Sequence, residues 1–243
     1  MQISTFRKNI FFTLLFLCMF SIPMKSQSQI EVDLGADLVS SYVWRGHKQA
    51  GASVQPYLSA SISGFSLGAW ASTDLTSKDG KKEVDFSASY TIGDFKAAIT
   101  DYWWDGEDQF RYFSSPAEGN NGHYLEATLG YTLPEKFPLS ITWNTFLLGK
   151  GNKKNDGENS YSTYIELAYP FSVKETNMSI STGFVPWQSA VYGTSSGLKF
   201  TSVTLSASKG IKITDSYTLP VFANIICNPA MEDIHFVFGI SIK

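Results

Sequence analysis

The residues best suited to chemistry in this chain are acidic side chains that recur at every second position along apolar segments. Glu31, Asp33 and Asp37 alternate with apolar or small residues, and so do Glu83 and Asp85. Side chains at alternate positions of a β-strand share one face, so these carboxylates are expected to gather on one side of a sheet. Rings of carboxylates inside a pore favour cations. The candidates for a channel interior are Arg45, Asp33, Asp37, Glu83, Asp85, Glu126 and Glu166.

Two interpretations of these charges remain open. In the first they line an open lumen, and Arg45 meets the passing solute. In the second the lumen is filled and the acids pair with cations inside it, as in small barrels. Arg45 would then bind an acid such as Asp37 or Glu83, and we favour this structural role for Arg45.

Motifs for catalysis and metal binding are weak in this sequence. Residues 193–197 read GTSSG and match G-x-S-x-G, but a nucleophile elbow joins a strand to a helix, whereas these residues join two expected strands. His47, His123 and His235 stand apart, without the H-E-x-x-H or C-x-x-C spacing of metal sites. We therefore expect neither an enzyme nor a metal or cofactor site.

An outer-membrane lipid hydrolase is the enzyme class that fits a barrel best. It needs a serine, a histidine and a polar residue together on the outer wall, and His123 with Ser140 or Ser162 is the nearest candidate set. The longest loop, 105–122, either folds into the barrel mouth or lies exposed. Its acids are possible ligands for a divalent cation: Asp105, Glu107 and Asp108.

The elements that position these residues are expected to be strands. After residue 28 no apolar run reaches the length of a transmembrane helix, and Gly, Ser, Thr, Tyr and Phe dominate the composition. The chain divides into about twelve segments of period 2, which is typical of a membrane barrel. The expected strands are 30–44, 54–62, 65–73, 83–92, 95–104, 123–132, 139–148, 161–171, 178–187, 199–209, 217–226 and 234–242.

Loop lengths and aromatic residues give these strands a common orientation. Long and short connections alternate, as they do between the external and periplasmic ends of outer-membrane barrels. Aromatic rings form belts at both membrane interfaces. The belt at the long-loop end is expected to contain Tyr42, Trp44, Trp103, Trp104 and Trp187, and the other belt Tyr90, Tyr131, Tyr169, Phe171 and Tyr217.

The first 28 residues have the pattern of a cleaved secretory signal peptide. Arg7 and Lys8 precede an apolar run over 10–22, and serines follow it. Loss of 1–28 lowers the basic residues from 19 to 16 against 22 acids, and the formal net charge changes from −3 to −6. Such an acidic chain is a poor partner for nucleic acid. Cys227 is then the single cysteine, which excludes an internal disulfide.

The segment DLVSSYVWRG, residues 37–46, carries the most specific motif. In this segment the chain resembles the TorF-like family of bacterial outer-membrane porins, which has S-x-Y-x-[FW]-R-G near its first strands. The matching residues are Ser40, Tyr42, Trp44, Arg45 and Gly46. The resemblance implies a membrane barrel with a transport function. The end of the leader also resembles that of secreted proteins of the Bacteroidetes type.

The sequence thus predicts an all-β protein, a transmembrane antiparallel up-and-down barrel of about twelve strands over 29–243 that follows the leader. We expect it in the bacterial outer membrane, exported through a Sec-type signal peptide and inserted by the barrel-assembly machinery. The last strand supports this insertion through its apolar face, although the chain ends on Lys243 instead of an aromatic residue. Membrane lipid and small polar solutes are the other expected partners.

The expected function is a narrow channel with an acidic lumen, because about twelve strands enclose less space than the barrel of a sixteen-stranded porin. The alternative is a structural or surface-interaction barrel whose lumen is closed. The sequence does not indicate an oligomeric state, because apolar residues that face lipid and those that face another subunit look alike.

Overall fold

The computed structural model describes residues 29–77, 80–104, 112–113, 122–154, 156–195 and 197–243. The predicted leader, 1–28, lies outside them. The regular structure of the described residues is entirely β. These residues include no helix that is long and apolar enough to cross a membrane.

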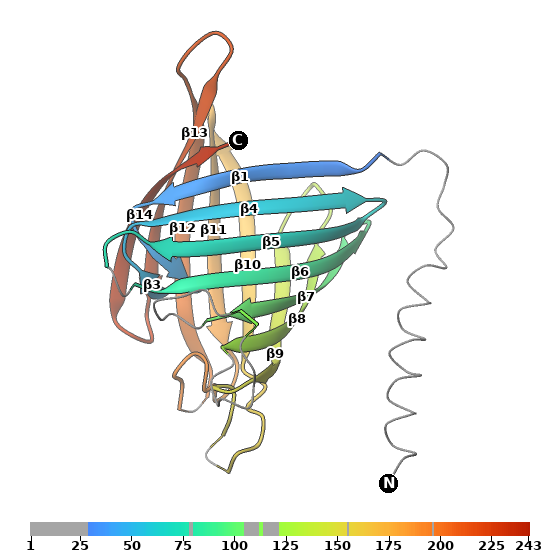
Figure 1. Cartoon of the computed structure of the whole chain (residues 1–243), viewed down its shortest axis with the longest axis vertical. Helices are drawn as coiled ribbons and strands as arrows, with labels where there is room; N and C mark the ends of the chain where they lie inside the picture. The colour runs from blue at the N-terminus through green and yellow to red at the C-terminus, as the bar shows by residue number, and fades with distance from the viewer. Residues whose placement is uncertain (1–28, 78–79, 105–111, 114–121, 155, 196) are drawn as a thin grey trace. The chain divides into compact units, whose positions relative to one another are not determined.

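Twelve of the fourteen strands in the described residues form a closed antiparallel barrel (Figure 1). β1 (Glu31–Val39) closes it by pairing with both β4 (Ser53–Ile62) and β14 (Asp233–Ile242). This confirms the predicted fold class. The other barrel strands follow in chain order: β5 (Phe65–Asp74), β6 (Lys82–Ile92), β7 (Phe95–Trp103), β8 (His123–Thr132), β9 (Ser140–Gly149), β10 (Thr163–Val173), β11 (Thr176–Val185), β12 (Lys199–Lys212) and β13 (Thr218–Asn228).

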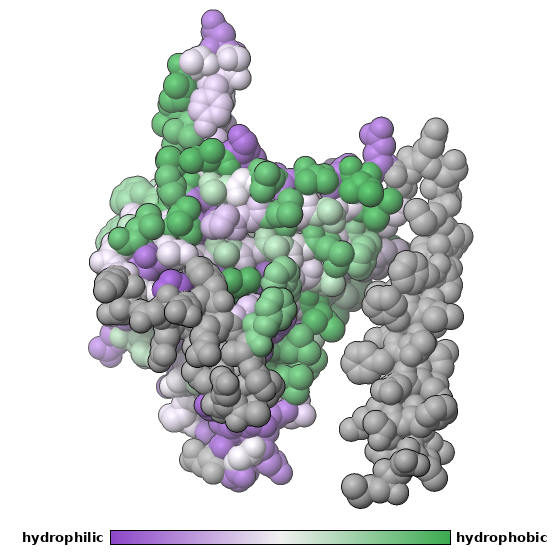
Figure 2. Space-filling view, in the orientation of Figure 1, coloured by the Kyte–Doolittle hydropathy of each residue, from purple (hydrophilic) through white to green (hydrophobic). Residues whose placement is uncertain are grey.

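The outward face of the barrel is apolar. Alternation along each strand turns large hydrophobic side chains outward, and Figure 2 shows them across the face turned to the viewer. A continuous exposed apolar surface of this kind marks a contact with membrane or with another protein. Its exposed members include Val32, Leu34, Leu58, Leu67, Phe86, Ile99, Leu129, Ile180, Phe236 and Phe238.

The longest connections between strands lie at one end of the barrel, although 133–139 at the other end is as long as 75–81. The end at which β1 begins and β14 finishes, here the short-turn end, carries tight turns such as Ser63-Gly64 and Gly93-Asp94. Residues with positive φ, including Ser63 and Gly64, make these turns possible. The opposite end, the long-loop end, has the connections 40–52, 75–81, 104–122, 150–162 and 186–198, together with the short 229–232.

The first predicted strand, 30–44, is wrong beyond Val39. The chain bends at residues 40–41, and a separate strand, β2 (Tyr42–Trp44), pairs with β3 (His47–Ala50) in a sheet of two strands. The alternation of side chains continues through the bend, so the sequence pattern does not reveal it. We call residues 40–52 the hairpin plug. The wall is continuous on either side of it, because Val39 and Ser53 are direct partners in the β1–β4 register.

Candidate functional site

The tip of the hairpin plug, residues 44–46, brings Arg45 to the inside of the barrel wall. Arg45 Nη1 and Nη2 donate to Glu126 Oε1 and Oε2 on β8, at 2.6 and 2.9 Å. Arg45 also donates to the hydroxyl of Tyr192, and the hydroxyl of Tyr102 donates to Glu126 Oε2 at 3.0 Å. Glu126 is fully buried and the Arg45 side chain is 12% exposed. A two-pronged pair of this kind is both strong and directional, so it fixes the position of the tip.

The partner of Arg45 is therefore Glu126, and the expected pairing with Asp37 or Glu83 is wrong. The hairpin plug carries Arg45 across the lumen toward β8, away from its neighbours in sequence. Burial disfavours a charged guanidinium, but Tyr192 and Glu126 outweigh this and raise the pKa of Arg45 above its ordinary value. Arg45 consequently stays protonated and acts as a fixed charge.

Aromatic rings enclose the guanidinium group. Arg45 Cζ lies 4.4 Å from the ring centroid of Trp44 and 4.7 Å from that of Tyr164 on β10. Desolvated cation–π contacts contribute about 2 kcal/mol. Trp44 stacks on Tyr192, with centroids 5.7 Å apart, and also meets rings from the barrel wall. These are Tyr102, Trp104 and Phe146.

Gly46 allows the plug to approach the barrel wall closely. Its φ is 84°, a conformation that side chains disfavour, and an added Cβ would lie 1.8 Å from the carbonyl oxygen of Thr201 on β12. Asn228 Nδ2 on β13 donates to the Gly46 carbonyl oxygen at 3.1 Å. Arg45 and Gly46 thus have distinct roles. Arg45 binds Glu126 on β8, and Gly46 packs against β12 and β13.

The lumen differs between its two ends. Toward the long-loop end the hairpin plug and the wall bury the inward side chains, which include Ser53, Ser72, Glu83, Glu126, Phe146, Tyr164 and Val185. Toward the short-turn end many inward side chains are small hydroxyl residues and partly exposed, although Tyr57, Lys96 and Phe222 also face inward. The small hydroxyl residues include Ser59, Ser61, Ser66, Ser87, Ser89, Thr100, Thr128, Thr142, Ser179, Ser181, Thr204 and Ser206. The inward side chains are therefore buried around the hairpin plug and partly exposed nearer the short-turn end.

Three of the predicted lumen acids lie in the half nearest the long-loop end. Glu126 holds Arg45, and Glu83 is buried, with Oε1 accepting a hydrogen bond from Trp104 Nε1 at 2.5 Å. Asp85 follows on the same face of β6 and is paired in register with Trp70 and Tyr102. Glu83 and Glu126 thus help to hold the plug region together.

Of the other predicted acids, Asp33 lies near the short-turn end, whereas Asp37 and Glu166 lie nearer the long-loop ends of β1 and β10. Asp37 accepts a hydrogen bond from Ser241 at 2.6 Å, and Asp33 lies 3.4 Å from Lys243 Nζ. Glu166 Oε2 on β10 accepts one from the hydroxyl of Tyr164 at 3.1 Å. That these acids form a ring of charge around a passing solute remains a prediction.

The expected interface aromatics fall into two groups. Tyr42, Trp44 and Trp104 were expected at the membrane interface, but the structure places them inside, where Tyr42 is buried and the two tryptophans pack together. The cause is the inward fold of the hairpin plug, around which these rings gather. Trp103 is outward by alternation and fully buried, whereas Trp187 is 41% exposed in the connection after β11.

His123 lies beside an acid that the sequence reading missed. Its Nδ1 is 3.0 Å from Asp101 Oδ2, and its Nε2 is 2.9 Å from the carbonyl oxygen of Tyr112. Both ring nitrogens are occupied, so neither is available to activate a serine. Ser140 pairs with Thr132 at the far end of β8, away from His123. Alternation alone places Asp101 and His123 on the outward faces of neighbouring strands, so this pair was readable from the sequence.

The remaining candidate motifs are the GTSSG segment and the acids of the 105–122 loop. Residues 193–197 lie between β11 and β12, so they join two strands as expected. The loop acids Asp105, Glu107 and Asp108 lie outside the described residues. In the described ranges, no cluster of three or more His, Cys, Asp or Glu side chains is placed to hold a metal ion.

The burial of His47 on β3 leads us to expect that the seating of the plug depends on pH. Burial lowers the pKa of His47, the nearby His235 lowers it further, and Asp233 acts in the opposite sense. When the pH falls below the ordinary histidine pKa of about 6.5, a displaced plug takes up a proton that the seated plug resists, so the seated state loses stability. We expect acrylamide quenching of Trp44 to increase between about pH 7.5 and about pH 5.

The measurement is the difference in quenching between the wild type and Trp44→Phe at each pH. His47→Gln cannot take up the proton and should show a flatter profile, with His123→Gln as the matched control that leaves the plug untouched. A profile for His47→Gln as steep as that of the wild type would contradict this account.

The part of the chain that forms this site matches a known family. Residues 24–219 match the model described as a bacterial protein of unknown function (Gcw_chp), a range that includes Arg45, Glu126, Tyr192 and Thr201. No curated protein matches the chain. Because the match covers most of the sequence, the protein belongs to the Gcw_chp family of bacterial proteins of unknown function.

Proposed function

We propose that this protein is an integral outer-membrane barrel that acts as a narrow, gated channel for small polar solutes, with a weak preference for cations. The hairpin plug is the gate. The motif around Trp44-Arg45-Gly46 supports a transport role through its similarity to the TorF-like porins.

The outward face supports the membrane location. Barrels that cross the outer membrane carry an apolar band with aromatic girdles and have their short turns in the periplasm. Tyr131 and Tyr217 are exposed near the short-turn end, and Trp187 is exposed near the long-loop end. β14 presents an alternating apolar face of the kind expected for the barrel-assembly machinery, made of Ile234, Phe236, Phe238, Ile240 and Ile242. A Sec-type leader over 1–28 completes this proposal.

The observation that carries the channel proposal is the lining of the half of the lumen nearest the short-turn end. A barrel that needs only a stable closed interior fills it with interlocking side chains. Here neighbouring strands instead present small hydroxyl side chains that solvent reaches, such as Ser87 and Ser89 on β6 and Thr100 on β7. Such a lining offers hydrogen bonds to polar solutes and leaves room for them.

The proposed cation preference follows from the charges beside this lining. Asp33, Asp37 and Glu166 lie on inward positions, and Lys96 is the inward cation of β7. Acidic groups along a pore raise the local concentration of cations. The excess of acids is small, so the preference is weak.

A closed-lumen barrel that works through its surface is the second candidate. The specific observation in its favour is the buried contact of Arg45 with Glu126, reinforced by Tyr102 and Tyr192. A pair so enclosed is costly to break. In that case the plug stays seated and no solute passes.

Removal of the plug separates the two candidates. Because Val39 and Ser53 are register partners, residues 40–52 can be replaced by a two-residue Asn-Gly turn that preserves the β1–β4 pairing. Both proteins are purified from outer membranes, checked for heat-modifiable migration and placed in planar bilayers. We expect the plugless protein to carry a steady current and the wild type to show brief openings.

Each outcome of this experiment decides between the candidates. Brief openings of the wild type together with a steady current through the plugless protein support the gated channel. A silent wild type beside a conducting plugless protein supports the closed-lumen barrel and overturns the channel. Silence from both folded proteins also overturns the channel.

A further inference from the structure

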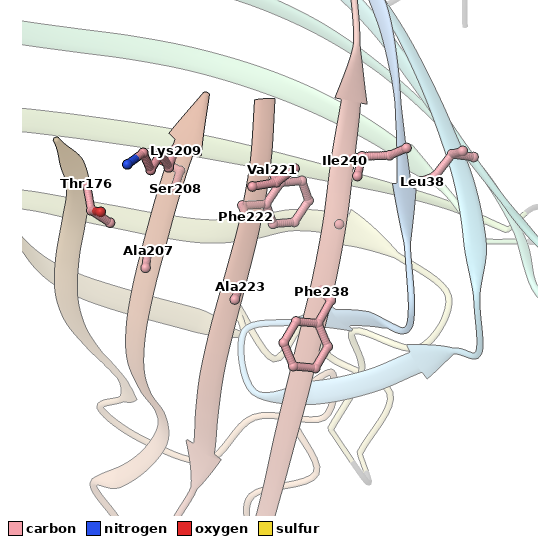
Figure 3. Close-up of a pocket in the computed structure, with 11 residues that line it drawn as sticks. Leu38, Thr176, Ala207, Ser208, Lys209, Val221, Phe222, Ala223, Phe238 and Ile240 are labelled. Atoms are coloured by element: carbon pink, nitrogen blue, oxygen red, sulfur yellow. The ribbon is translucent and has the colours of Figure 1, made fainter. Parts of the chain in front are cut away.

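A groove on the outward face of the barrel lies across β12, β13 and β14, toward the short-turn end. It encloses about 500 Å³ and is lined almost wholly by apolar atoms (Figure 3). Ala207 and Ala223 are cross-strand partners, and Phe238 is the partner of Ala223 on β14. Ala207 and Ala223 are small, and the ring of Phe238 beside them is large. The outer surface of the wall is therefore hollow over the two alanines.

Two residues with polar groups border this apolar groove. Lys209 lies two residues from Ala207 on the same face of β12, and Thr176, the first residue of β11, also lines the groove. Lys209 is 48% exposed and its Nζ lies 3.0 Å from Glu175, which is 83% exposed. Exposed ion pairs of this kind contribute less than about 1 kcal/mol, so an arriving anionic group can displace Glu175.

The groove thus combines an apolar slot with a cation at the rim of the barrel. Lys209 and Thr176 lie next to the β10–β11 turn, whereas Ala207, Ala223 and Phe238 lie one step farther from the short-turn end (Figure 3). In a bilayer, the charged end of the groove lies at the depth of the lipid headgroups and its apolar part at the depth of the acyl chains.

We propose that this groove binds one phospholipid with an anionic headgroup. The phosphate lies at Lys209 and Thr176, and one acyl chain lies over Ala207 and Ala223. The inference rests on the proposed outer-membrane location, which places the short-turn end in the periplasm and the groove in the inner leaflet, where phospholipids are found. A cationic side chain near the surface favours an anionic lipid by a factor of about five, the equivalent of about 1 kcal/mol.

The test is native mass spectrometry of the full-length protein purified from outer membranes in detergent. The protein is incubated with equal amounts of phosphatidylglycerol and phosphatidylethanolamine. We expect the wild type to retain phosphatidylglycerol about fivefold over phosphatidylethanolamine. Lys209→Gln should lose the preference, Ala223→Leu should lower the retention of both lipids by filling the slot, and Glu175→Gln should strengthen the preference.

Lys136→Gln is the matched control, because Lys136 is an exposed lysine of the β8–β9 turn at the same end of the barrel. Retained preference in Lys136→Gln and its loss in Lys209→Gln support the site. Equal retention of both lipids by the wild type, or an unchanged preference in Lys209→Gln, overturns it. A lipid-free dimer, or preferential retention of lipopolysaccharide, also overturns it by assigning another occupant.

Failure of this inference is distinct from failure of the proposed function. Heat-modifiable migration and recovery from the outer-membrane fraction are measured first on every variant. Recovery of the wild type from the soluble fraction overturns the membrane location itself. A membrane-inserted barrel without lipid preference overturns the groove alone.

Discussion

Replacement of Arg45 by methionine is expected to destabilise the seated hairpin plug by about 3 to 5 kcal/mol. Methionine occupies similar space but leaves the Glu126 carboxylate buried without its bidentate partner. The plug should then leave the lumen in much of the population. We expect a lower midpoint in denaturant unfolding of the detergent-solubilised protein, and faster protease cleavage within residues 40–52.

Two companion variants test the physical reason. Arg45→Met combined with Glu126→Met leaves no buried charge and should recover most of the lost stability. Lys212→Gln is the control for an exposed pair, since Lys212 Nζ lies 2.6 Å from Asp215, and it should change the stability by less than about 1 kcal/mol. A loss of similar size in Lys212→Gln and Arg45→Met would contradict the special role of the buried pair.

Gly46→Ala is expected to prevent the plug from seating although it adds a single methyl group. The residue has a φ of 84°, and the new Cβ would lie 1.8 Å from the backbone oxygen of Thr201. Thr201 lies where the β11–β12 register shifts, and its backbone carbonyl cannot turn aside, as a side chain does, without moving β12. We expect a steady current in planar bilayers, close to that of the plugless protein.

Gly157 provides a closely matched control for Gly46. Its φ is also 84°, but among the described residues, chain neighbours aside, no heavy atom lies within 4 Å of an added Cβ. Gly157→Ala therefore measures the backbone cost alone, roughly 1 to 2 kcal/mol, and should leave the channel gated. Gly46→Ala should cost about 1 to 3 kcal/mol more, the usual range for overpacking. Equal effects of the two substitutions would show that the contact with Thr201 is unimportant.

The wall of the barrel was predictable because the alternation of side chains is a local property. The segment 123–132 was predicted with the bounds that β8 has, and most other strands agree to within two residues. The same alternation placed Glu126 and Glu166 on the inward face. The same alternation also places small hydroxyl residues, such as Ser87 and Ser89, at inward positions. The prediction from the sequence did not use this feature.

The hairpin plug was not predictable because its position depends on contacts between distant residues. No glycine or proline marks the bend at residues 40–41, and the alternation through Tyr42 and Trp44 continues that of β1. Arg45 and Glu126 are 81 residues apart in the chain. A motif match drew attention to Trp44-Arg45-Gly46, but a pattern of residue types does not show which wall the tip meets.

The contacts of the plug tip also impose an order on assembly. Arg45 meets Glu126 on β8, and Gly46 is held by Asn228 on β13, 182 residues later in the chain. Closing such distant contacts is slow because the chain between them must first be ordered. We therefore expect the tip to seat only after the strands from β8 to β13 have formed. Seating of the tip is thus expected to be a late event in assembly.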